Sequence, residues 1–192
     1  MEPRETVALK RACEATQIPS GFRVVLPPGA QVIVQQVLGG NFTVMTAQGA
    51  LVRIDATDAD ALGERYEAEA RKAIEAARAK AGPVDPGAPF DEQRVWEVLK
   101  TVYDPEIPAS IVELGLVYLC HAEPLPEGGQ KVTVRMTLTA PGCGIGPVLI
   151  DEVRRKVAAI PGVAQADVEL VFDPPWEPSM MSEAARLQLG FL

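Results

Sequence analysis

The chain has 192 residues, enough for one large domain or two small ones, and its hydrophobic content of 47% can fill ordinary cores. Its net charge of −8 argues against a nucleic-acid surface, because phosphate binding needs clustered Lys and Arg. No apolar run approaches the roughly 20 residues that a membrane span needs, and the opening stretch MEPRETVALKRACEATQ contains no signal-peptide core, so a cytoplasmic protein is expected.

The first part of the chain predicts a small all-β unit. Residues 1–17 are mixed and polar and predict a short helix or a frayed strand; Cys13 lies there without a nearby Cys or His and is interpreted as incidental. Tight turns containing Gly or Pro divide residues 18–56 into four predicted strands, GFRVVL, AQVIVQQVL, NFTVMTA and ALVRIDA. The unit carries no catalytic constellation, which favours a docking or scaffolding role.

A helix and a linker follow the β unit. Residues 58–81 predict one helix that Asp58 or Asp60 would cap. Its apolar positions are mostly alanine, so we interpret it as a connector or as a helix that packs on a partner subunit. The stretch GPVDPGAP has the composition of a linker. The predicted domains are residues 1–82, the β unit with its connecting helix, and residues 83–192.

The second domain predicts an α+β fold, a small mixed three-stranded sheet with helices packed on it. Asp91 and Ser182 are the expected N-caps of its first and last helices, and Gly190 is the expected end of the last. The predicted elements are helix, strand, strand, helix, strand and helix, over residues 91–102, 116–122, 132–139, 147–160, 164–172 and 183–189.

The loop TAPGCGIGP, between the second strand and the next helix, presents one cysteine, Cys143. Its Gly and Pro residues stop the strand, and Pro147 suits the first helical position, where its missing N–H costs nothing. Cys143 is expected just before a helix N-terminus, where free backbone N–H groups favour the thiolate that binds metals and attacks electrophiles. The alternative is a small residue that fills a tight turn.

Two carboxylates, Asp104 and Glu106, lie close together in the stretch YDPEIPASIVELGLVY. Pro105 and Pro108 end the preceding helix and fix the conformation of the loop. The carboxylates could act as oxygen ligands, or they could cap the turn that follows.

Cys120 and His121 are neighbours in the predicted strand LVYLCHA. Successive strand residues point to opposite faces of a sheet, so the two cannot form a local metal pair. Cys120 is expected in the core, as free cysteines often are, and His121 at the surface.

Four separated motifs resemble those of one known family, in the same order, over residues 90–192. They are YDPEIPASIVELGLVY, the strand into LTAPGCGIG, the PGV turn and the tail DPPWEPSMMSEAARLQLG. The family is that of SufT, PaaD and the eukaryotic cytosolic iron–sulfur assembly proteins, and the form GCGIGP with an additional N-terminal β unit is most similar to its SufT members. The resemblance implies a non-enzymatic factor of the SUF type that assembles iron–sulfur clusters or matures client apoproteins together with other assembly proteins.

The resemblance also implies the site residues. Asp104 and Glu106 match the acidic loop positions, Thr139 matches the threonine that ends the central strand, and Cys143 matches the loop cysteine; Ala140 stands where some relatives have a second Thr. Iron–sulfur clusters usually take four thiolate ligands, so one loop cysteine predicts a transient cluster. The missing ligands would come from a second protomer in a homodimer, from a partner protein, or from the two carboxylates.

Two rival functions remain open. A metal-free adaptor would bind client proteins through the β unit and the tail, where Trp176, Met180 and Met181 are either anchors to the core or a client-binding patch. A thiol enzyme would use Cys143 as nucleophile and a loop carboxylate as base. Such sites generally use a histidine partner, and the single His121 is a poor candidate.

Overall fold

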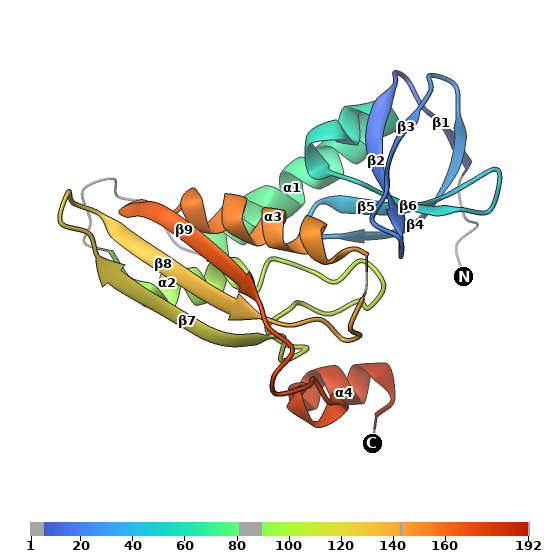
Figure 1. Ribbon diagram of the computed structural model, residues 1–192. Helices are drawn as coiled ribbons and strands as arrows, with labels where there is room; N and C mark the ends of the chain where they lie inside the picture. Colours follow the sequence, from blue (N-terminus) through green and yellow to red (C-terminus); the bar gives the residue numbers. More distant parts are fainter. Residues whose placement is uncertain (1–5, 81–89, 143, 192) are drawn as a thin grey trace. The chain divides into compact units, whose positions relative to one another are not determined.

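The structure, a computed structural model, describes residues 6–80, 90–142 and 144–191 (Figure 1). The chain divides into two compact units, Met1–Arg78 and Ala79–Leu192. Within the described ranges, no helix is both long and apolar enough to cross a membrane.

The first unit is built on an antiparallel six-stranded sheet with the strand order β1-β4-β5-β6-β2-β3. Its strands are β1 (Thr6–Ala8), β2 (Cys13–Ile18), β3 (Arg23–Leu26), β4 (Gln31–Leu38), β5 (Asn41–Thr46) and β6 (Leu51–Ile54). The sequence predicted β3 to β6. For residues 1–17 it left a short helix or one frayed strand open, where the structure has β1 and most of β2. Small side chains, Cys13 and Ala15, fill the core from β2 and carry little apolar signal.

A 3-10 helix, η1 (Ala56–Leu62), and an α-helix, α1 (Glu64–Lys80), follow the sheet. The prediction of one continuous helix was wrong, because the chain turns at Gly63, whose φ of 109° few other residues adopt. On either side of the turn, Leu62 and Tyr66 are buried in the core of the sheet. Tyr66 meets the ring of Phe42 edge to face, with ring centroids 5.8 Å apart.

The expected cap of this helical region was also wrong. Asp55, rather than Asp58 or Asp60, caps η1 by accepting a hydrogen bond from the N–H of Thr57. Asp58 and Asp60 both bind the guanidinium group of Arg11. The Arg11 contact lowers the pKa of Asp60, and the two carboxylates tie the β1–β2 connection to η1.

The second unit has the predicted α+β fold, and the predicted fold class is confirmed. In its three-stranded sheet, β7 runs antiparallel to β8, and β8 runs parallel to β9. Its elements are α2 (Glu92–Leu99), β7 (Val117–Pro124), β8 (Gln130–Met136), α3 (Gly146–Ala158), β9 (Val163–Leu170), η2 (Pro178–Met180) and α4 (Glu183–Leu189).

One face of this sheet is covered. Along β8, Val132, Val134 and Met136 are fully buried, whereas Thr133 is half-buried and Arg135 is exposed. This alternation is that of a strand with one face toward the core. The helices contribute fully buried side chains to the core as well, namely Val95 and Leu99 from α2 and Leu149, Val153 and Val157 from α3.

Three expected helix boundaries are confirmed. Asp91 caps α2 by accepting from the N–H of Gln93, and Ser182 caps α4 by accepting from the N–H of Ala185. Gly190 ends α4 in the left-handed conformation that glycine favours.

Candidate functional site

The predicted acidic residues lie on a loop between α2 and β7 that closes on itself. At its base, the N–H of Ile111 donates to the carbonyl oxygen of Val102 at 2.9 Å, and Tyr103 forms an isolated antiparallel bridge with Ser110. These contacts close the base of a short loop, Asp104 to Ala109, which we call the acidic loop.

Asp104 is the structural centre of the acidic loop. Its side chain is buried, with a residue exposure of 5%. Its Oδ1 accepts hydrogen bonds from the N–H groups of Glu106 at 2.8 Å and Ile107 at 3.0 Å. Asp104 therefore caps the following turn, as one interpretation of the sequence expected. A carboxylate offers about four lone-pair sites, so capping and metal ligation are compatible roles.

Glu106 lies at the surface, two residues further along the acidic loop. Partial desolvation of its carboxyl group, and next the neighbouring charge of Asp104, raise the pKa of Glu106 above its ordinary value. Both causes disfavour a second negative charge beside Asp104. A cation bound between the two groups would relieve that repulsion.

The other predicted site residues follow β8. Thr139 is half-buried in a bend three residues beyond the end of that strand, and Gly142 has a φ of 84°. Cys143 lies outside the described residues. α3 begins at Gly146, one residue before the expected start, and the side chain of its N-cap residue, Ile145, makes no capping hydrogen bond. Backbone N–H groups at a helix start favour negative charge.

Sequence reasoning missed two features near these residues. Thr137 was expected on the polar face of a strand, but it is 1% exposed, and its hydroxyl has no hydrogen-bond partner among the residues that the structure describes. No sequence signal marks this burial, because the strand ends one residue earlier. Ser110 and Glu113 form a reciprocal capping box, and their S-x-x-E spacing is a readable signal.

Cys120 and His121 are placed as expected. Cys120 is buried, and desolvation followed by the charge of Glu92 raises its pKa to about 11. His121 is exposed on the opposite face of β7. Burial likewise raises the pKa of Cys13. Over residues 6–80, 90–142 and 144–191, no group of three or more His, Cys, Asp and Glu side chains is arranged to hold a metal ion.

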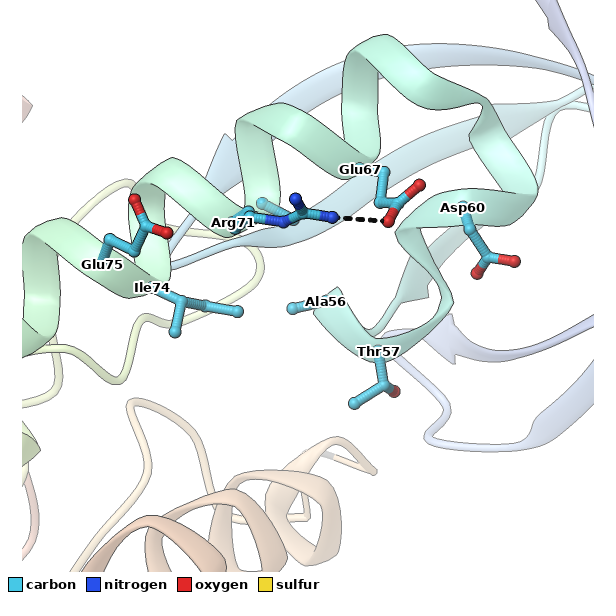
Figure 2. Close-up of a pocket in the computed structure, with 8 residues that line it drawn as sticks. Ala56, Thr57, Asp60, Glu67, Arg71, Ile74 and Glu75 are labelled. Atoms are coloured by element: carbon cyan, nitrogen blue, oxygen red, sulfur yellow. Dashed lines mark hydrogen bonds and ion pairs between the residues drawn. The ribbon is translucent and has the colours of Figure 1, made fainter.

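The first unit has a surface groove between η1 and α1 (Figure 2). Three of its charged side chains are paired: Arg71 lies 2.9 Å from Glu67, and Asp60 binds Arg11. Its apolar lining includes Ile74. The groove presents no catalytic grouping, so the acidic loop and the loop after β8 remain the candidate site.

Comparison with known proteins places the matched region in the second unit. A family model described as "Iron-sulfur cluster assembly protein" matches residues 92–169. An Fe-S protein maturation auxiliary factor of Porphyromonas gingivalis is 46% identical over 101 residues, which cover 53% of this chain and 92% of that protein. The Fe-S protein maturation auxiliary factor SufT of Staphylococcus aureus is 45% identical over 89 residues, which cover 46% of this chain and 97% of that protein.

A solved structure is similar as well. The domain of unknown function DUF59 from Bacillus anthracis is 32% identical, with a TM-score of 0.48, and the match covers 53% of this chain and 92% of that chain. The six-stranded sheet of the first unit lies outside the residues that the family model matches. Because nearly the full length of the maturation factors aligns with this chain at 45–46% identity, the chain belongs to the iron–sulfur cluster assembly protein family.

Proposed function

We propose that this protein is a transient carrier that holds an iron–sulfur cluster, or iron, as cargo and delivers it to client apoproteins. In this proposal Cys143 supplies the thiolate ligand, Asp104 and Glu106 supply oxygen ligands, and Thr139 donates a hydrogen bond to the cargo. The relatives that match about half of this chain are named as maturation auxiliary factors, which supports a non-enzymatic role.

The number of available sulfur ligands carries the proposal. The chain has three cysteines. Cys13 and Cys120 are buried with raised pKa values, and the thiolate is the form that binds metals. Cys143 is then the single thiol left to bind a cluster that usually takes four thiolates. The other ligands must come from a second protomer, from an assembly protein, from the client or from carboxylates, and incomplete ligation permits handover.

The acidic loop suits the oxygen part of this ligand set. Two backbone N–H groups donate hydrogen bonds to Asp104 and orient its carboxylate, and Glu106 lies two residues further along at the surface. Carboxylates are harder ligands than the thiolates that suit iron–sulfur clusters, so oxygen ligation should hold the cargo less tightly. Desolvation is the main cause of the raised pKa of Glu106, and the charge of Asp104 is the second; a bound cation would offset that second cause.

A metal-free adaptor is the second candidate, and an observation on the first unit favours it. Phe22 and Val25 are 70% and 67% exposed, and Val25 lies on β3, an edge strand of the sheet. Exposed apolar side chains at a sheet edge are suited to docking a protein partner.

Anaerobic reconstitution separates the two candidates. The full chain is incubated with ferrous iron and sulfide, freed of excess reagents, and mixed with an apo-ferredoxin as acceptor. A carrier should show cluster absorption after reconstitution and should lose it as the ferredoxin gains its own spectrum. If the reconstituted chain retains neither iron nor sulfide, the carrier proposal is wrong and the adaptor stands.

A further inference from the structure

The chain after β9 does not end at the sheet but returns across the turn that precedes β7 (Figure 1). We call residues 172–191 the C-terminal strap and residues 110–116 the capped turn. The strap is bound largely through main-chain groups. The indole N–H of Trp176 donates to the carbonyl oxygen of Leu114 at 2.8 Å, and the N–H of Ser182 donates to that of Glu113 at 2.8 Å. Just beyond the turn, the hydroxyl of Tyr118 donates to the carbonyl oxygen of Pro174 at 3.0 Å.

Gly115 shows how closely the strap approaches. A Cβ atom at Gly115 would lie 2.2 Å from the carbonyl oxygen of Met180, and the φ of this glycine is +68°. Any side chain at position 115 would therefore collide with the strap backbone. Met181, the next residue of the strap, is buried.

The capped turn in turn holds the acidic loop. Glu113 Oε2 accepts from both the N–H and the hydroxyl of Ser110, at 3.0 and 2.9 Å. Ser110 is bridged to Tyr103, and the N–H of Asp104 donates to the carbonyl oxygen of Ala109 at 3.3 Å. A continuous series of contacts thus leads from the strap, through the capping box, to the buried carboxylate.

The strap also reaches the acidic loop directly, because the side-chain amide of Gln188 in α4 donates to the carbonyl oxygen of Pro108 at 3.4 Å. The strap therefore contacts the acidic loop at Pro108, and the capped turn contacts its base through Ser110. We expect both contacts to restrict the motion of the loop.

We propose that the C-terminal strap is a positioning element for the acidic loop, and that its docking on the capped turn holds Asp104 and Glu106 in the arrangement described above. Trp176 and Gly115 are its positioning residues. The relevance of that arrangement to iron rests on the proposed carrier function, but the positioning itself is a property of the metal-free chain.

Gly115→Ala tests the positioning, with Gly128→Ala as the matched control. Gly128 also has a positive φ, +95°, but a Cβ atom there would meet nothing within 4 Å. Both variants place a Cβ atom at a positive φ, and only Gly115→Ala should displace the strap. Trp176→Phe, which loses the bond to Leu114 but keeps an aromatic ring, is a milder second variant.

Amide hydrogen exchange in the full-length, metal-free protein is the measurement. In Gly115→Ala, the amides of Glu106 and Ile107, which donate to Asp104, should exchange about tenfold faster or more than in Gly128→Ala, while those in β8 and α3 should match the control. Trp176→Phe should shift the same two amides to a smaller extent.

Equal exchange of these two amides in Gly115→Ala and Gly128→Ala would overturn the proposal. If Gly115→Ala does not fold, Trp176→Phe decides: unchanged exchange at Glu106 and Ile107 contradicts positioning by the strap. Iron binding, measured separately on the wild type, decides the carrier function, so either proposal can fail without the other.

Discussion

Cys143→Ser is expected to lower cluster loading in anaerobic reconstitution to about a tenth of the wild-type level or less. A serine hydroxyl stays protonated at neutral pH, and its oxygen is a harder ligand than the thiolate sulfur that iron–sulfur clusters favour. Cys13 and Cys120 cannot replace the lost sulfur without local unfolding, since both are buried. Iron and sulfide content, together with the visible absorption spectrum, measure the effect.

Cys120→Ala is the matched control for this substitution. It removes one sulfur as well, but from a strand position whose side chain faces the core. It should load as much cluster as the wild type, at some loss of stability from the smaller side chain. Equal loading of Cys143→Ser and the wild type would exclude Cys143 as a ligand, and loss of loading in Cys120→Ala alone would move the site into the sheet.

Lys156→Met is expected to lower the free energy of unfolding by roughly 2–4 kcal/mol. This is somewhat less than the roughly 3–5 kcal/mol for removing one partner of a fully buried ion pair, because the Lys156 side chain is partly exposed. Lys156 Nζ lies 2.9 Å from Glu152 Oε1 and also donates to the carbonyl oxygen of Thr101 at 2.8 Å. The Glu152 side chain is 2% exposed and that of Lys156 is 26% exposed. Loss of the ammonium group would remove one charge partner of the buried Glu152 carboxylate, which water reaches poorly. It would also remove the hydrogen bond between α3 and Thr101, which follows α2.

Urea unfolding followed by circular dichroism measures this loss, with Lys100→Met as the surface control. Lys100 pairs with Glu97, but the two side chains are 51% and 32% exposed, so its loss should cost less than about 1 kcal/mol. The double variant Glu152→Met/Lys156→Met should recover most of the stability, because replacing both charges by apolar groups removes the desolvation cost. A single Lys156→Met variant as stable as Lys100→Met would contradict a buried pair.

The second unit could largely be predicted because its signals are local. The alternation in β8 fixes which face of the strand is buried, and the caps at Asp91 and Ser182 and the stop at Gly190 mark helix ends through contacts within a few residues. For the same reason, the acidic loop was recognised from Pro105 and Pro108. Asp104 and Glu106 are only two residues apart, so their sequence positions alone place them on the same loop.

The parts that were missed depend on distant contacts or on weak apolar signals. β2 fills its core positions with Cys13 and Ala15, which do not stand out as a strand. Gly63 reads as one tolerated glycine within a helical pattern, whereas the packing of Leu62 and Tyr66 on the same core requires a turn there. The strap passes Gly115 at Met180, more than 60 positions later in the chain, and local sequence patterns do not reveal such a long-range contact.

The most direct test of the carrier proposal is the alkylation footprint of the three cysteines, read by mass spectrometry, in protein with and without a reconstituted cluster. The proposal predicts that loading slows alkylation of Cys143 about tenfold or more, while Cys13 and Cys120 stay unreactive in both states. Protection at Cys120, or equally fast alkylation of Cys143 with and without the cluster, would contradict the claim that Cys143 is the sulfur ligand of the cluster.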